Sequence, residues 1–242
     1  MIPKSHPRYL SLTIRDCLVK GVKSGITSLH GLTAHGRGEA FDYLLGEKTN
    51  EFAREGIEAA AALLLLAKHP VISVNGNTAA LAAKELIKLG KLIPAPLEVN
   101  LFHSSKKRER AIRNYLMNKG AVNILLPQSG FTIPHLASNR KFVNQNGIFK
   151  ADVVFVPLED GDRTEALIKN GKKVITVDLN PLSRTARKST ITIVDNIIRA
   201  LPLIIETVKI LRLKDRKTLQ KIVAAYDNKE ILKKAVGQMK KV

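Results

Sequence analysis

The stretch Val71–Leu89 reads VISVNGNTAALAAKELIKL and indicates a strand, a turn and a helix in direct succession. Its strand-forming residues run into Asn75-Gly76, a pair that by itself favours a β-hairpin. The segment after the pair argues against a hairpin, because its apolar residues recur at helical spacing up to Gly90, which is expected to end the helix. The sequence therefore predicts a strand–turn–helix unit, the building block of parallel α/β sheets.

The turn in this unit, Asn75–Thr78, matches neither G-x-G-x-x-G nor G-x-x-x-x-G-K-[ST]. Gly76 can adopt a positive φ, and Asn77 or Thr78 can cap the helix, which would leave main-chain N–H groups open to an anion. An ordinary capped turn explains the same residues, so both interpretations stay open.

The alternation of strands and helices continues to residue 211. Continuous apolar strands between helices predict an α/β fold with a Rossmann-like, doubly wound, mostly parallel sheet covered on both faces. Such sheets bind ligands beyond the carboxyl ends of their strands. Strands are expected at Val71–Val74, Leu97–Phe102, Val122–Leu126, Val153–Val156, Val174–Val177 and Thr190–Val194, and helices at Thr78–Leu89, Ser105–Lys119, Pro134–Gln145, Arg163–Asn170 and Asn196–Leu211.

The remaining segments read as helical and lead to one domain over residues 1–242. It comprises an N-terminal helical segment (1–70), a Rossmann-like core (71–205) and a basic helical tail (206–242). Within the first segment, helices are expected at Pro7–Gly21, Thr27–Leu45 and Thr49–Lys68. In the tail, apolar residues at helical spacing predict amphipathic helices.

Composition limits the class of protein. The 242 residues are 45% hydrophobic, and the longest apolar run, Ala59–Ala67, is too short to span a membrane. The first ten residues, MIPKSHPRYL, have no apolar segment typical of a secretory signal. Cys17 is the single cysteine, which excludes an internal disulfide and a cysteine pair for a metal. A cytoplasmic protein is therefore expected.

The net charge of +19 favours either a nucleic-acid binder or an enzyme with polyanionic substrates. Residues 207–242 carry 11 Lys or Arg and 3 Asp or Glu, a net +8 that fits the solvated face of amphipathic helices. Aromatic residues make up only 5% and tryptophan is absent, so bases would find few stacking partners. The enzyme is the preferred interpretation.

Three further stretches suggest anion binding, each beside a simpler explanation. In HSSKKRERAIRNYL (His103–Leu116), Ser104 or Ser105 caps a helix whose first turn is basic, at a cost of about 0.3–1 kcal/mol per cation. That helix either recruits an anion or is a surface helix. In VDLNPLSRTARKST (Val177–Thr190), a carboxylate at a strand tip suits a ribose or Mg²⁺ and the arginines suit phosphates, although an Asx-Pro turn explains the same residues.

The third stretch, GLTAHGRGEAF (Gly31–Phe41), has glycines on both sides of Arg37, which imply a helix break or a close approach. Arg15 reads as a surface residue paired with an acidic neighbour, and Asp195 as a helix N-cap. The histidines lack the spacing of a zinc site, and no G-x-S-x-G elbow is found. Neither a protein-held zinc ion nor a covalent nucleophile is expected.

Several long motifs, occurring in order, resemble those of the archaeal phosphopantothenate synthetases, which are 4-phosphopantoate–beta-alanine ligases. They are IPKSHPRYLSLTIRD, GITSLHGLTAHGRGEAFDYLLGEKT, VISVNGNTAALAA, EVNLFHSSKKRE and VDLNPLSRTARKSTITIVDNI, and the likeness extends from Ile2 to about Ile205. The basic tail is the least diagnostic part.

The resemblance implies an enzyme that joins 4-phosphopantoate to beta-alanine on the archaeal route to coenzyme A. Members consume ATP, release AMP and pyrophosphate, pass through a phosphopantoyl-adenylate and are Rossmann-like homodimers. The family's ATP-contacting positions correspond here to Arg15, Arg37, Asp178, Leu179, Asn180, Arg184, Thr185, Asn196 and Ile197.

With this chemistry, the remaining candidates take roles. Asn75, Gly76, Asn77 and Thr78, with Lys106 to Arg113, are expected to receive the phosphate of 4-phosphopantoate. Mg²⁺ would assist the arginines at the triphosphate, and His103 and His135 are candidate bases. The expected partners are these small molecules and a second copy of the chain, with no nucleic acid or membrane. A nucleic-acid binder that uses its basic tail and a non-enzymatic nucleotide sensor remain the alternatives.

Overall fold

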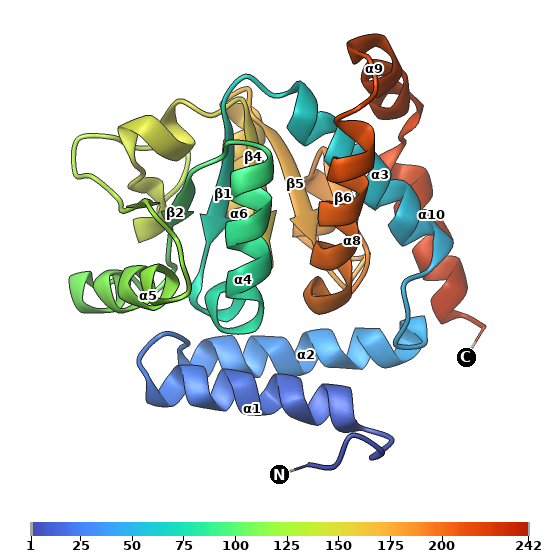
Figure 1. The fold of residues 1–242 in the computed structure, drawn as a ribbon, viewed down its shortest axis with the longest axis horizontal. Helices are drawn as coiled ribbons and strands as arrows, with labels where there is room; N and C mark the ends of the chain where they lie inside the picture. Colours follow the sequence, from blue (N-terminus) through green and yellow to red (C-terminus); the bar gives the residue numbers. More distant parts are fainter. Residues whose placement is uncertain (1, 242) are drawn as a thin grey trace.

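Residues 2–241, which the computed structural model describes, contain one sheet of six parallel strands in the order β3-β2-β1-β4-β5-β6 (Figure 1). The chain winds outward from β1 to β3, returns to β4 beside β1, and winds outward again to β6. This is the Rossmann order, with its switch point between β1 and β4. It confirms the predicted α/β fold. The strands are β1 (Pro70–Val74), β2 (Leu97–Val99), β3 (Ile124–Leu125), β4 (Val153–Pro157), β5 (Lys173–Val177) and β6 (Ile191–Ile193).

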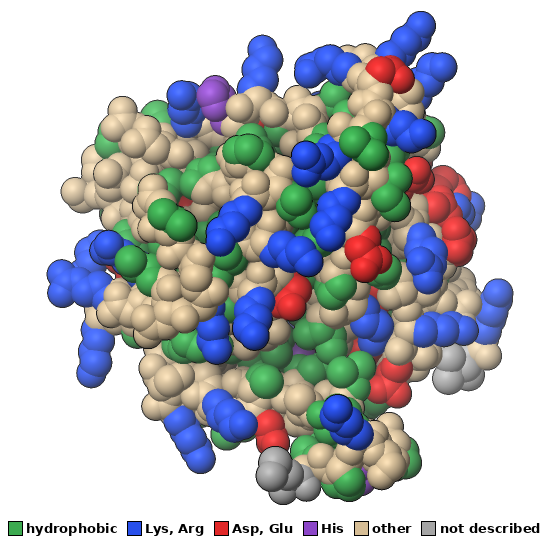
Figure 2. Space-filling view, in the orientation of Figure 1, with side chains coloured by type: hydrophobic (Ala, Val, Ile, Leu, Met, Phe, Trp, Pro, Cys, Tyr) green, Lys and Arg blue, Asp and Glu red, His purple; other side chains and the backbone are tan. Residues whose placement is uncertain are grey.

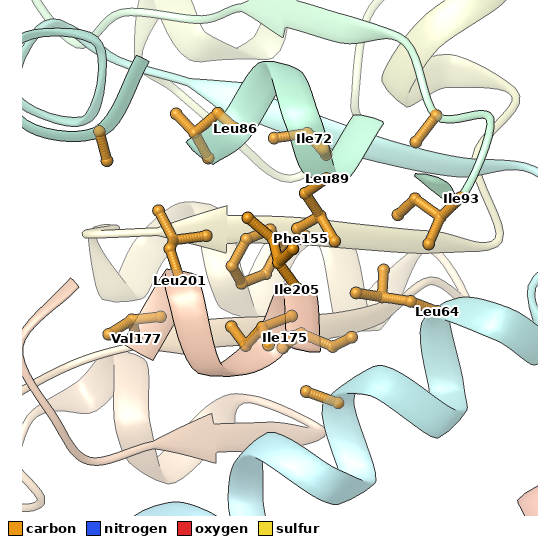
Figure 3. Packing of buried hydrophobic residues seen from close by; sticks show 14 of the residues in the cluster. Leu64, Ile72, Leu86, Leu89, Ile93, Phe155, Ile175, Val177, Leu201 and Ile205 are labelled. Atoms are coloured by element: carbon orange, nitrogen blue, oxygen red, sulfur yellow. The ribbon is translucent and has the colours of Figure 1, made fainter. Parts of the chain in front are cut away.

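Both faces of the sheet are covered, because neighbouring strand residues point to opposite sides. Ile72 and Phe155 pack with α3 (Glu51–Leu66), α4 (Gly76–Leu92) and α8 (Ile197–Leu211), as Figure 3 shows. Val71 and Val154 face the other way, toward α6 (Gly161–Lys169) and the chain between β3 and β4. The strands are buried on both sides, which is why they read as continuous apolar runs.

The first two helices cross one end of this layered core. In Figure 1, α1 (Tyr9–Lys23) and α2 (Leu29–Leu45) lie side by side below α4 and α8. Contacts join α1 to α4 and α2 to α4, so the helical segment packs directly on the first helix after the switch strand. This position places α2 over the turns that follow the strands.

The basic tail forms α9 (Arg216–Ala225) and α10 (Asn228–Met239), as the amphipathic pattern predicts. Leu219, Ile231 and Leu232 are buried, and both helices pack against α3. Their cations point outward, and Figure 2 shows Lys and Arg side chains clustered at the α9 end. No helix among residues 2–241 is both long enough and apolar enough to cross a membrane.

The predicted helix Pro134–Gln145 is wrong. That region contains a 3₁₀ turn, Asn139–Lys141, and a π-helical turn, Gln145–Phe149. Tertiary hydrogen bonds compete with an α-helix here: the Asn100 amide donates to the carbonyls of Arg140 and Phe142 at 3.1 and 3.0 Å. Long-range partners of this kind override local helix propensity. The two α-helices not yet named are α5 (Lys106–Asn118) and α7 (Arg184–Lys188).

Four local predictions also need correction. Gly90 does not end α4 but lies inside it, where a Cβ would lie 2.7 Å from Leu97. Gly36 and Gly38 do not break α2, which is continuous, and Gly76 has no positive φ. Asp195 is not the N-cap of α8: Asn196 caps it, while Asp195 binds Thr49 and Arg199.

Candidate active site

A cavity of about 730 Å³ opens at the carboxyl ends of the strands, around the switch point. Its walls come from α2, from the turns after β1, β2, β4 and β5, and from the start of α8. Its volume suits small-molecule ligands. The lining includes Ser28, His30, His35, Arg37, Asn75, Gly76, Asn77, His103, Arg108, Arg140, Leu158, Glu159, Asp160, Asp178, Leu179, Asn180, Ser183, Thr185, Asn196 and Ile197.

The turn after β1 is held rigidly by its own side chains. Asn75, and not the predicted Asn77 or Thr78, is the N-cap of α4. Its Oδ1 accepts from the Thr78 N–H at 3.0 Å, and the Thr78 hydroxyl accepts from the Asn75 N–H at 2.9 Å. The Asn77 amide donates to the Gly31 carbonyl at 2.8 Å. These side chains are therefore engaged with protein, and the turn offers an anion the first main-chain N–H groups of a 17-residue helix.

Arg108 reaches this helix start from α5. Its Nε donates to the Ile26 carbonyl at 3.1 Å and its Nη1 to the His103 carbonyl at 3.0 Å. Burial lowers the pKa of Arg108, which stays charged at neutral pH. None of the ion pairs between residues 2–241 includes it, so its charge stands beside a helix N-terminus without a counter-ion.

Gly76 is required for this arrangement. A Cβ there would collide with the Ile26 carbonyl oxygen and lie 2.8 Å from Nη2 of Arg108. Glycine is needed here because the absence of a side chain lets Ile26 and Arg108 approach the main chain closely, and not because of a positive φ.

On the opposite side of the switch, the turn after β5 is built around Asp178. Its carboxylate accepts from the Asn180 N–H at 2.9 Å and from the Ser183 hydroxyl at 2.5 Å. The pKa of Asp178 is raised above its ordinary value, because burial outweighs the opposing effect of these two hydrogen bonds. Ser183 in turn caps α7 by accepting from the Ala186 N–H. The result is a fixed polar loop at the tip of β5.

The start of α8 is fixed by a buried ionic network. The Asn196 amide donates to Asp42 of α2 at 2.8 Å, and Arg199 binds both Asp42 and Asp195. Thr49 donates to Asp195 at 2.6 Å. Asp42, Asp195 and Asn196 are each at most 5% exposed, so the network fixes α2 against the N-terminus of α8.

The turn after β4 carries two carboxylates among arginines. Leu158 adopts φ 59°, a left-handed conformation that is strained for this residue. Glu159 forms ion pairs with Arg140 and Arg163, and Asp160 accepts from Arg140 at 2.7 Å. Burial lowers the pKa of both arginines to about 10, so both remain charged at neutral pH.

The cavity brings together most of the ATP positions inferred from the resemblance: Arg37, Asp178, Leu179, Asn180, Thr185, Asn196 and Ile197. Arg15 and Arg184 are not among its lining residues. Arg15 forms two 2.9 Å hydrogen bonds with Glu39, and Arg184 pairs with Asp162 and Glu165. Each is about half exposed.

Of the residues proposed for the substrate phosphate and for the base, some line the cavity and others do not. Asn75, Gly76, Asn77 and His103 line the cavity, and Thr78 lies buried behind it as part of the capping box. Lys106 pairs with Glu109 at 3.1 Å, and Arg113 and His135 are exposed elsewhere. His103 stacks on His30 with ring centroids 4.6 Å apart.

Sequence reasoning missed Arg140, Glu159 and Asp160, and it did not single out Arg108 from its basic neighbours. Glu159 and Asp160 carried a usable signal, because they lie within four residues of the end of the predicted strand Val153–Val156, and the carboxyl ends of strands are where ligands bind. Arg140 carried none, because its segment was predicted to be an ordinary helix.

The donors in the cavity fit a magnesium–nucleotide complex better than a metal held by protein alone. Among residues 2–241, no group of three or more His, Cys, Asp or Glu is arranged to hold a metal ion. Mg²⁺ bound with phosphates needs only one or two carboxylates. Asp178, whose oxygens already accept two hydrogen bonds, has lone pairs left for that role.

Comparison with known proteins identifies the family. Residues 52–242 match the family described as Phosphopantothenate/pantothenate synthetase. Among similar proteins, the 4-phosphopantoate--beta-alanine ligase of Thermococcus kodakarensis is 54% identical over 96% of this chain and 89% of its own length. The proteins of the same name from Thermococcus onnurineus and Methanosarcina mazei are 52% and 48% identical, over 96% and 98% of this chain and 89% and 94% of their own lengths. The chain therefore belongs to the phosphopantothenate/pantothenate synthetase family.

Proposed function

We propose that this protein is a 4-phosphopantoate–beta-alanine ligase of archaeal coenzyme A biosynthesis. It joins the two substrates through a phosphopantoyl-adenylate, consuming ATP and releasing AMP and pyrophosphate. Relatives that share about half of its residues over nearly its whole length carry the name of this activity.

The observation that carries the proposal is the pair of anion-binding ends on either side of the switch point. The reaction must bring a carboxylate to the α-phosphate of ATP, and these two anions repel each other. Positioning and charge neutralisation therefore supply most of the catalysis. A cavity with helix N-termini and arginines at both ends meets this requirement.

ATP would occupy the side of β5 and α8. The loop from Asp178 to Ser183, the start of α8 at Asn196-Ile197 and the side chain of Arg37 form this wall. Mg²⁺ would accompany the nucleotide with Asp178 as a protein ligand, and it would offset the charge of the triphosphate. Arg15 and Arg184 would have to leave their carboxylate partners to reach the nucleotide.

4-Phosphopantoate would occupy the side of β1 and α4, with its phosphate at the start of α4. Main-chain N–H groups of Gly76 and Asn77 and the guanidinium of Arg108 are the donors there. Arg108 takes the role that the sequence assigned to Lys106 and Arg113, because it is the cation of α5 that lines the cavity. His103, at the same wall, remains the candidate base.

Two further assignments complete the proposal. We propose that the enzyme acts as a homodimer, as the resemblance to the family implies, and in the cytoplasm, as expected from the composition. Sedimentation of the purified protein tests the first assignment.

A coupled assay of pyrophosphate release, with substrates omitted one at a time, tests the function. We expect sustained release only when ATP, 4-phosphopantoate and beta-alanine are all present, with AMP as the nucleotide product. Formation of ADP, or equal use of unphosphorylated pantoate, would contradict the proposal.

A further inference from the structure

Asp160 is the one carboxylate among those lining the cavity that is both open to it and placed at the switch point. The lining contains three Asp or Glu residues within the described chain: Glu159, Asp160 and Asp178. The Glu159 side chain is 1% exposed and enclosed by two arginines. Asp178 is half-buried, but it lies after β5, away from the switch point, where it accepts hydrogen bonds from Asn180 and Ser183. The Asp160 side chain is 33% exposed.

The position of Asp160 is fixed from several sides. Its Oδ1 caps α6 by accepting from the Arg163 N–H at 2.9 Å, and its Oδ2 accepts from Arg140 at 2.7 Å. The preceding turn is held by the Asn75 amide, which donates to the Leu158 carbonyl at 2.7 Å, and by Thr185, which donates to the Glu159 carbonyl at 3.1 Å. A strained turn persists only where its surroundings over-determine it, as here.

The location of this carboxylate matters for the second half of the reaction. Asp160 follows β4, and the Asn75 turn follows the neighbouring β1, with the nucleotide wall on the other side. The acyl-adenylate is formed from 4-phosphopantoate on the β1 side and from the nucleotide on the β5 side, so its carbonyl carbon must lie between these two sides of the cavity. An amine that attacks this carbon has to arrive near the switch point.

The charge of Asp160 suits that amine. Beta-alanine enters as a zwitterion, and Arg37, Arg108 and the helix N-termini that line the cavity repel an ammonium group. Asp178, the other accessible carboxylate, lies on the nucleotide side. Each Asp160 oxygen accepts one hydrogen bond and keeps a lone pair, and the side chain is partly exposed, so the carboxylate can attract the ammonium group by a charge-assisted hydrogen bond. Because Asp160 is partly exposed, water reaches it and can carry away the proton that the ammonium must lose before its nitrogen attacks.

We propose that Asp160 binds the ammonium group of beta-alanine and that Arg140 holds the Asp160 carboxylate in place. The proposal rests on the proposed function, since it names the subsite of one of its substrates. It assigns Asp160 to the second half-reaction alone. Formation of the adenylate requires no ammonium group, so it should not depend on Asp160.

The test is Asp160→Asn, which keeps an oxygen to cap α6 and removes the charge. We expect the KM for beta-alanine to rise roughly tenfold to a hundredfold, as for loss of one charge-assisted hydrogen bond. Exchange of labelled pyrophosphate into ATP, measured with 4-phosphopantoate and without beta-alanine, should keep its wild-type rate. Hydroxylamine, which is mostly unprotonated near neutral pH, should still trap the adenylate as a hydroxamate at the wild-type rate.

The matched control is Asp215→Asn, because Asp215 also caps a helix through the third N–H beyond it, at 2.9 Å, but lies in the tail. It should leave every rate unchanged. An unchanged KM for beta-alanine in Asp160→Asn, or an equal loss of pyrophosphate exchange, would overturn the inference. A wild-type chain without exchange would refute the proposed function instead, and the inference with it.

Discussion

The side-chain amide of Asn75 donates a hydrogen bond of 2.7 Å to the main-chain carbonyl of Leu158, and this bond joins the turn after β1 to the turn after β4. The same side chain caps α4 through its oxygen. Asn75 thus connects the two halves of the sheet at the point where strand order reverses. Its side chain holds these two turns of the cavity together, and the main-chain N–H groups of Gly76 and Asn77 are the proposed donors to the phosphate.

Replacing Asn75 by Ser separates the two roles, since Ser caps helices well but lacks the amide donor. We expect a loss of stability of about 1 kcal/mol and a lower kcat, because the Leu158 turn is no longer held. Urea unfolding and steady-state kinetics measure the two effects. Asn170→Ser removes a comparable tether, 3.2 Å to the Pro134 carbonyl, away from the cavity, and should lower stability alone. Equal kcat values for the two variants would argue against a positioning role.

Gly76→Ala should lower both stability and affinity for 4-phosphopantoate. The new methyl group would collide with the Ile26 carbonyl and displace Arg108, at a cost of roughly 1–3 kcal/mol. Gly36→Ala is the contrasting change, because its Cβ meets nothing within 4 Å and it lies within α2. That substitution should raise stability by about 0.5–1 kcal/mol, as expected for a helical glycine. Thermal unfolding measures the stability of both variants. A melting temperature of Gly76→Ala equal to that of the wild type would contradict the close approach at Gly76.

Arg108→Ala should raise the KM for 4-phosphopantoate roughly tenfold to a hundredfold, the range for hydrogen bonds to a charged group. The KM for ATP should change little, since the nucleotide lies on the other side of the switch. Arg110→Ala, an exposed arginine on the same helix, controls for the loss of net charge. If both Michaelis constants rose together in Arg108→Ala, the division of the cavity would be wrong.

Glu98 should make the protein less stable as the pH rises toward neutrality. Burial raises the pKa of Glu98 from its ordinary 4.5 to about 7, although N–H groups of Ile148 and Asn144 oppose the shift. The folded form therefore holds the proton more tightly than the unfolded chain. The resulting stabilisation, about 3 kcal/mol by linkage, is fully present below pH 4.5 and is lost as the pH rises through 7.

Urea unfolding at a series of pH values measures this effect. Glu98→Gln stays uncharged, so its stability should fall less between these two pH values than that of the wild type. Glu58→Gln, at an exposed position of α3, should follow the wild-type curve. Parallel curves for Glu98→Gln and wild type would exclude Glu98 as the source of the pH dependence.

The parallel sheet could be predicted from sequence because each strand is buried on both faces and reads as an apolar run. The strand order, and with it the position of the switch point, could not be predicted, because it depends on which strands pair across the sheet. The strand–turn–helix at the start of α4 could also be predicted, since its residues act within one turn of chain, although the cap is Asn75 and not Asn77 or Thr78. Features that depend only on residues close together in the chain can be recognised from their spacing in the sequence.

The rest depends on contacts that are distant in sequence. The Glu98 carboxylate accepts hydrogen bonds from the N–H groups of Asn144 and Ile148. These bonds help to hold the end of the predicted helix Pro134–Gln145, and the residues after it, in irregular turns. Arg15 and Arg184 are held by Glu39 and Glu165, partners 24 and 19 residues away. No spacing in the sequence records such pairings, and so the sequence suggested arginines without showing which ones face the cavity.

The most direct test of the account follows an isotopic label from the carboxylate oxygens of 4-phosphopantoate. A phosphopantoyl-adenylate forms when one of these oxygens attacks the α-phosphate, and that oxygen stays on phosphorus when the amine of beta-alanine displaces AMP. Mass spectrometry should therefore find the label in AMP. Label in inorganic phosphate, with ADP as the other product, or no transfer of label at all, would contradict the account.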